Sequence, residues 1–86
     1  MLFGVCAPVG LAGIKSIELS WDASVAHDVA FYRAYRNGQK IADGLTKTIY
    51  SDSDVVSDQK YSYTITAVDA KMNESAASAP VEIIFP

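Results

Sequence analysis

The sequence predicts an all-β domain, a seven-stranded antiparallel β-sandwich. Apolar and polar residues alternate with period two in several short runs, as they do along strands with one buried face. About seven such runs follow one another at roughly 8 to 12 residue intervals, with turn-forming residues between them. A helix is poorly supported, because the alanine-rich segment 75–79 is short, lacks a 3.6-residue period and runs into Pro80.

Length and composition exclude several classes of protein. The 86 residues suffice for one domain, and the 50% hydrophobic and 20% charged composition is that of a globular chain. A net charge of −3 gives no basic stripe for nucleic acid, so we expect no nucleic-acid partner. No apolar run is long enough to span a bilayer, so we expect no membrane partner.

The second of the expected strands lies at "SIELSW", where alternate residues are apolar. Ile17, Leu19 and Trp21 share one face, which we predict to be buried. A third strand over 30–36 ends at Asn37-Gly38, the strongest short-range signal for a hairpin with a type I′ turn.

Alternation along the third strand and the later strands completes the predicted core. Tyr32 and Ala34 fall on one face of the third strand. In "KYSYTITAVD", Tyr61, Tyr63, Ile65 and Ala67 occupy alternate positions and therefore share one face of the strand. In the last run, Val81, Ile83 and Phe85 alternate with Glu82 and Ile84. The predicted core residues are Ile17, Leu19, Trp21, Tyr32, Tyr61, Tyr63 and Ile65.

The order and spacing of these segments resemble a fibronectin type III domain, especially the bacterial kind. The matching segments are "APVGL", "IELSW", "DVAFYRAYRNGQKIA", "TIYSDSDV", "YSYTITAVDAKMNES" and "SAPVEI". The resemblance covers residues 8–86 and leaves residues 1–7 as an N-terminal tail or an artificial remnant. An immunoglobulin domain proper is less well supported, because Cys6 is the only cysteine.

The resemblance implies an immunoglobulin-like fold with two sheets. One sheet holds the first, second and fifth strands, and the other holds the third, fourth, sixth and seventh. Trp21 is then the core tryptophan, and the Tyr61 hydroxyl anchors the loop before its strand. The turn before Tyr61 departs from many bacterial members because it has no Pro-Gly pair.

The resemblance also implies a function without catalysis. The chain would be a spacer or accessory module of a larger exported bacterial protein, such as a carbohydrate-active enzyme. Its partners would be neighbouring domains of the same polypeptide, or a protein or polysaccharide, outside the cell or at its surface. The alternative is a protein-interaction or adhesion module of a bacterial surface protein or a phage structural protein.

Two polar clusters are considered as chemical sites and set aside. His27 lies near Asp22, Ser24 and Asp28 in one short segment, but no oxyanion glycines or nucleophile turn accompany them. We therefore expect no catalytic residue. The run "SDSDVVSD" contains Asp52, Asp54 and Asp58, but it lacks the glycine and closing glutamate of a calcium loop. We expect these aspartates to stabilise turns, and we expect no metal and no cofactor.

The outward face of the third strand carries the candidate recognition residues. Phe31, Arg33 and Tyr35 are aromatic and basic side chains of the kind that is enriched at binding hot spots and that stacks on sugars. The other interpretation is that the two rings cover Thr64 and Thr66 of a neighbouring strand and stabilise the sheet. We favour this second interpretation, because scattered exposed apolar residues are common on protein surfaces.

Overall fold

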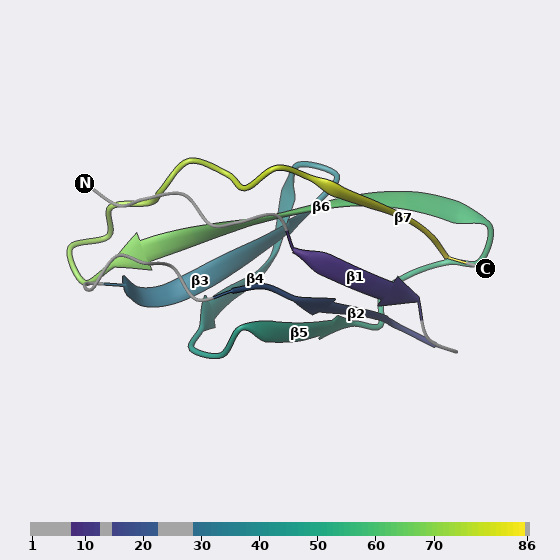
Figure 1. The fold of residues 1–86 in the computed structure, drawn as a ribbon, viewed down its shortest axis with the longest axis horizontal. Helices are drawn as coiled ribbons and strands as arrows, with labels where there is room; N and C mark the ends of the chain where they lie inside the picture. The colour runs from purple at the N-terminus through teal and green to yellow at the C-terminus, as the bar shows by residue number, and fades with distance from the viewer. Residues whose placement is uncertain (1–7, 13–14, 23–28, 86) are drawn as a thin grey trace.

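The computed structural model describes residues 8–12, 15–22 and 29–85, which form a sandwich of two layers (Figure 1). Within these ranges there is no helix long and apolar enough to cross a membrane. The predicted tail, residues 1–7, lies outside the described part of the chain. The strands are β1 (Val9–Ala12), β2 (Ile17–Ser20), β3 (Val29–Arg36), β4 (Gln39–Leu45), β5 (Ile49–Asp52), β6 (Gln59–Asp69) and β7 (Val81–Phe85).

All strand pairs are antiparallel, and the sheets have the composition that the resemblance implied. The three-stranded sheet has the order β1-β2-β5, and the four-stranded sheet has the order β4-β3-β6-β7. The fold class is therefore confirmed. The layers approach closely where β1 meets β7, because Gly10 leaves space for the Ile83 side chain that a Cβ would occupy.

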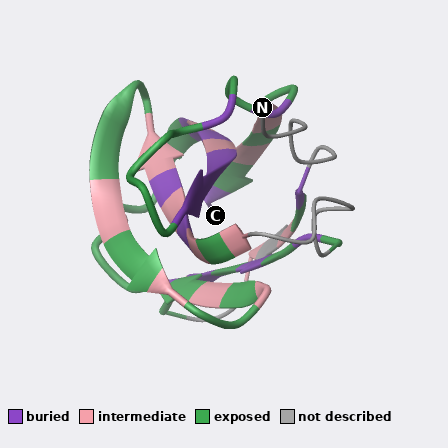
Figure 2. Ribbon diagram, turned by 90° about the vertical axis from the view of Figure 1, so that its left-hand side faces the viewer, coloured by how far each residue is buried: buried purple, intermediate pink, exposed green. Residues whose placement is uncertain are grey.

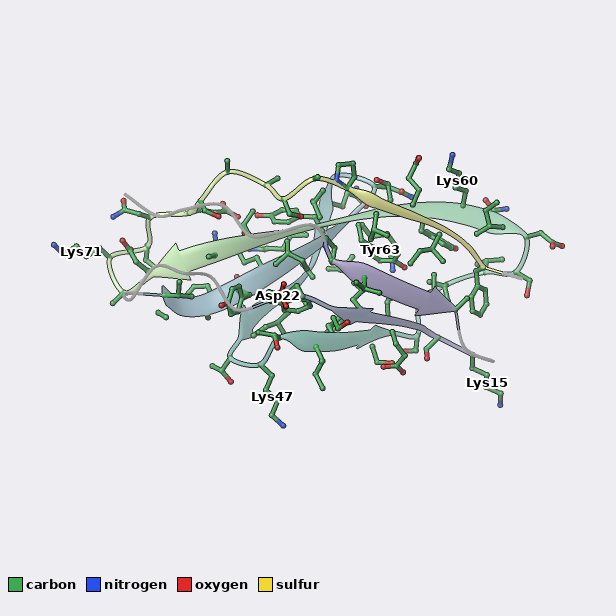
Figure 3. All side chains as sticks on the ribbon, viewed as in Figure 1. Lys15, Asp22, Lys47, Lys60, Tyr63 and Lys71 are labelled. Atoms are coloured by element: carbon green, nitrogen blue, oxygen red, sulfur yellow. The ribbon has the colours of Figure 1, made fainter. Side chains whose placement is uncertain are left out.

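The core lies between the two sheets, where buried residues gather (Figure 2). Tyr63 projects into this space, while Lys15, Lys47, Lys60 and Lys71 lie at the periphery (Figure 3). The buried cluster contains three residues beyond the predicted core, namely Ala34, Ala67 and Phe85. It also contains every residue of the predicted core: Ile17, Leu19, Trp21, Tyr32, Tyr61, Tyr63 and Ile65.

The turn between β3 and β4 is held against the neighbouring strand. Asn37 and Gly38 have φ values of 51° and 83°, the positive values that a type I′ turn requires. The Asn37 N–H donates to the carbonyl of Ser62, and the Ser62 N–H donates to Asn37 Oδ1. These bonds, 2.8 and 2.9 Å long, fix the end of the hairpin beside β6.

The segment between β6 and β7 has no strand of its own beyond an isolated bridge at Glu74, yet it completes the edge of β6. Ser75 accepts a hydrogen bond from the Ala67 N–H at its hydroxyl and donates its own N–H to the Ala67 carbonyl. Ser78 makes the same pair of bonds with Ile65. Two serine hydroxyls thus satisfy backbone groups that a partner strand would otherwise satisfy.

The hydroxyl of Tyr61 ties the loop after β5 to the core. It accepts a hydrogen bond from the Val56 N–H at 2.7 Å, while its ring is buried. We expect Tyr61→Phe to lower the free energy of unfolding by about 1–3 kcal/mol, because the Val56 N–H loses its acceptor. Urea denaturation measures the change, and a variant with the midpoint of the original chain would contradict the anchoring role.

Candidate functional site

The candidate recognition residues lie on the outer face of the four-stranded sheet, the face that points away from the core. Tyr35 pairs with Thr64 of β6, as the sheet-stabilising interpretation expected. Arg33, however, pairs with Thr66, and Phe31 pairs with Val68, a residue that is fully buried. The structure therefore places all three residues beside β6. Of the two rings that were expected to cover Thr64 and Thr66, however, only the ring of Tyr35 belongs to a residue that pairs with a threonine.

Arg33 is engaged by groups of its own domain. Its Nε donates to Asp43 Oδ1 at 3.0 Å, its Nη1 lies 3.3 Å from Glu74 Oε1, and its guanidinium lies 5.4 Å from the centre of the Phe31 ring. The hydrogen bond to Asp43 raises the pKa of Arg33. Arg33, followed by Lys40, lowers the pKa of Asp43 to about 2. The guanidinium of Arg33 is therefore already paired within the domain, and only 14% of the Arg33 side chain is exposed.

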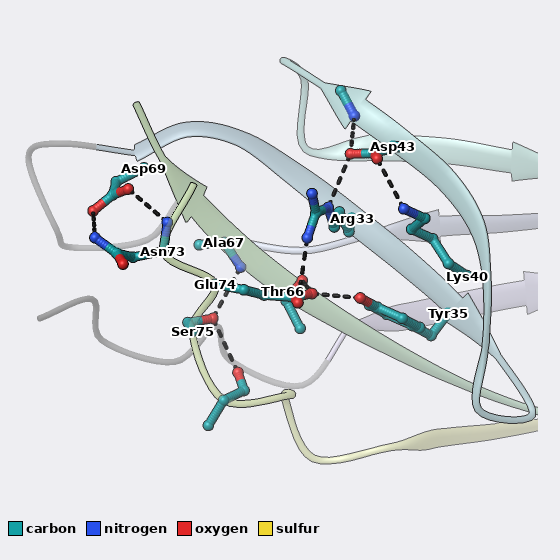
Figure 4. A network of polar contacts seen from close by, with 12 residues as sticks. Arg33, Tyr35, Lys40, Asp43, Thr66, Ala67, Asp69, Asn73, Glu74 and Ser75 are labelled. Carbon is teal, nitrogen blue, oxygen red and sulfur yellow. Dashed lines mark hydrogen bonds and ion pairs between the residues drawn. The ribbon is translucent and has the colours of Figure 1, made fainter. Parts of the chain in front are cut away.

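Tyr35 and Glu74 form the second part of this network (Figure 4). The Tyr35 hydroxyl donates to Glu74 Oε2, and the Thr66 hydroxyl donates to the same oxygen at 2.7 Å. The hydrogen bond from Tyr35 is the largest cause of a lowered pKa at Glu74. Burial, followed by this hydrogen bond, raises the pKa of Tyr35. Glu74 is thus a carboxylate held between one guanidinium and two hydroxyl donors.

A groove of about 350 Å³ adjoins this network on the outer face of the sheet. Its volume falls within the rough range of 300–1,000 Å³ that small-molecule sites occupy. The lining residues are Tyr35, Gly38, Thr64, Thr66, Glu74, Ser75 and Ala77.

A buried polar cluster between the sheets was not predicted. Asp52 ends β5 and is 2% exposed. Its Oδ1 accepts a hydrogen bond from the Asp54 N–H at 3.2 Å, as expected of an aspartate that stabilises a turn, but it also has partners in the core that the sequence did not indicate. Arg36 Nη1 donates to both of its oxygens, at 2.9 and 2.8 Å, and the Tyr63 hydroxyl donates to Oδ2 at 2.7 Å. The bond to Asp52 raises the pKa of Arg36, and burial, followed by the same carboxylate, raises that of Tyr63.

The cluster around His27 that was considered from the sequence lies largely outside the part of the chain that the structure describes. His27, Ser24 and Asp28 lie outside the described residues, and Asp22 is exposed. Among the residues that the structure describes, no three His, Cys, Asp or Glu side chains converge as metal ligands.

The charged residue of the groove that was not identified from the sequence is Glu74. It sits in a segment without periodicity, and its three partners lie on other elements, so no local signal could have identified it.

Comparison with known proteins supports the fold and adds sequence relatives. A solved Fn3-like protein from Clostridium thermocellum matches with a TM-score of 0.87 and 22% identity, over 99% of this chain and 94% of that one. A poly(3-hydroxybutyrate) depolymerase of Ralstonia pickettii is 43% identical over 79 residues, 87% of this chain and 16% of that protein. Chitinase A1 of Niallia circulans is 39% identical over 82 residues, which make up 90% of this chain and 12% of that protein. No model of a protein family matches the sequence.

The sandwich topology and these matches define a small immunoglobulin-like module. The chain has the fold of a fibronectin type III-like domain, and its sequence is similar to segments that make up a small part of larger bacterial enzymes, among them a depolymerase and a chitinase. It spans less than a fifth of the length of these curated relatives.

Proposed function

We propose that this domain is a non-catalytic spacer or accessory module in a larger exported bacterial protein, and that this protein is a carbohydrate-active enzyme. The observation that carries the proposal is the unequal coverage of the matches. Nearly the whole chain aligns with only 12% of Chitinase A1, so the aligned segment is a minor part of a protein named for its activity. Residues 8–86 form the module in this proposal, and its partners are the neighbouring domains of the same polypeptide.

The way in which the ionisable groups are used supports a role without catalysis. Glu74 and Arg33 on the four-stranded sheet and Asp52 in the core each have charged partners within the domain. A general acid, a general base or a nucleophile must instead face a reacting group across a cleft. An extracellular or cell-surface location is part of the proposal, because insoluble polymers are degraded outside the cell.

Replacement of the module in its parent protein tests the proposal. We expect that exchanging residues 8–86 for a flexible linker leaves hydrolysis of a soluble oligosaccharide unchanged and slows hydrolysis of the insoluble polymer. Release of reducing sugar measures both rates. Loss of activity on the soluble substrate would show that the module belongs to the catalytic unit. A parent protein without hydrolytic activity that adheres to cells through this module would favour the adhesion alternative.

A further inference from the structure

We propose that the groove between Tyr35 and residues 74–77 binds a neutral, hydroxyl-rich chain, namely a strand of polysaccharide. This inference rests on the proposed accessory role and identifies the class of polymer that the module contacts. It differs from the flat recognition face considered from the sequence. Arg33 lies over the Phe31 ring and pairs with Asp43, and of these three candidate residues only Tyr35 borders the groove.

The shape of the groove suits a short stretch of an extended chain. Thr64 and Thr66 come from β6, Tyr35 comes from β3, and the remaining wall is formed by the segment that contains Glu74 and Ala77. Gly38 stands at the hairpin end, and a Cβ there would meet no atom within 4 Å, so this end is open. An open-ended groove accepts a segment of a polymer, whereas a closed cavity accepts only a small molecule.

The hydrogen-bonding capacity of the groove selects a ligand rich in donors. A hydroxyl has one hydrogen, and both Tyr35 and Thr66 donate theirs to Glu74 Oε2. The Tyr35 oxygen can therefore only accept a further bond, and the Glu74 carboxylate is likewise an acceptor. Thr64 adds a hydroxyl that can donate or accept. A polysaccharide offers many O–H donors to such a surface, whereas a polyester offers only carbonyl and ester acceptors along its length.

The charge of the groove favours a neutral ligand. The Glu74 carboxylate lies 3.3 Å from Arg33 Nη1, so the two charges offset each other beside the groove. Neither a strongly cationic nor a strongly anionic polymer gains a net attraction from this pair. The ring of Tyr35 supplies an apolar surface next to these polar groups, a combination that suits a sugar with its hydroxyl edges and C–H faces. The internal bonds also hold the acceptors in place before a ligand arrives.

Titration of the isotope-labelled domain with oligomers tests the proposal. The probes are cellohexaose, chitohexaose and maltohexaose, with a hexamer of 3-hydroxybutyrate as the polyester. We expect at least one oligosaccharide to shift the amide signals of Thr64, Thr66 and Ala77, and we expect the polyester to leave them in place. Shifts of these signals by the polyester would overturn the assignment of ligand class. Shifts confined to other residues, or none with any oligosaccharide, would overturn the groove as a site.

Two pairs of variants separate binding from folding. Thr64→Val and Tyr35→Phe remove one hydroxyl each from the groove, and we expect each to weaken oligosaccharide binding about three- to tenfold, the loss of one hydrogen bond. Thr46→Val and Tyr50→Phe make the same chemical changes outside the groove and should leave affinity unchanged. Equal affinity in all four variants would contradict the proposal. This result would leave the spacer role intact, because that role is judged by the activity of the parent protein.

Discussion

Replacing Asp52 with Ala is expected to lower the free energy of unfolding by about 3–5 kcal/mol, the usual cost of removing one partner from a buried ion pair. Asp52 joins the two sheets, since it lies on β5 while its partners Arg36 and Tyr63 lie on β3 and β6. Without the carboxylate, a largely buried guanidinium and a buried phenol lose their acceptor. Urea denaturation followed by circular dichroism measures the change.

Further variants test whether the charge pair or only the packing is responsible. Asp52→Asn preserves the shape and can still accept from Tyr63, so it should cost less than Asp52→Ala. Exchanging both members, with Asp52→Leu and Arg36→Met together, should recover much of the stability, because no buried charge is then left unpaired. A double variant that is as unstable as the sum of its single changes would contradict the coupling between the two residues.

Most of the fold could be predicted because its signals are local. A strand with one buried face shows its alternation within a few residues, and Asn37-Gly38 specifies its turn from two neighbouring residues. Tyr61 was assigned its anchoring role by family resemblance, and its acceptor role toward Val56 is a contact only five residues apart. Such features depend little on the rest of the chain.

The polar contacts between elements were not predictable in the same way. Asp52 stands in a run of Asp and Ser that is typical of turns, and the four residues of β5 are too few to show a clear alternation. Arg36, its partner, is 16 residues away, and Glu74 is 39 residues from Tyr35. The groove arises only after the segment before β7 folds back along β6, so no motif in the sequence describes it.

Replacing Trp21 with Ala is the second change with a large expected effect. Trp21 follows β2 and is 5% exposed, and its ring meets the edge of Tyr32 from the opposite sheet at 5.8 Å between ring centres and 66° between planes. No described residue hydrogen-bonds its Nε1, so within this part of the chain its contribution comes from packing. Truncation should cost about 3–5 kcal/mol, because the cavity removes both buried area and the aromatic contact.

This loss is a large share of the roughly 5–15 kcal/mol that stabilises a native domain, so the variant should be partly unfolded at moderate temperature. Circular dichroism during thermal and urea denaturation is the appropriate measurement, since Trp21 is the only tryptophan and its fluorescence is lost with it. Trp21→Phe is the matched control: it keeps a ring against Tyr32 and should cost clearly less. If Ala and Phe variants unfold at the same urea concentration, the aromatic contact between the sheets is not what Trp21 contributes.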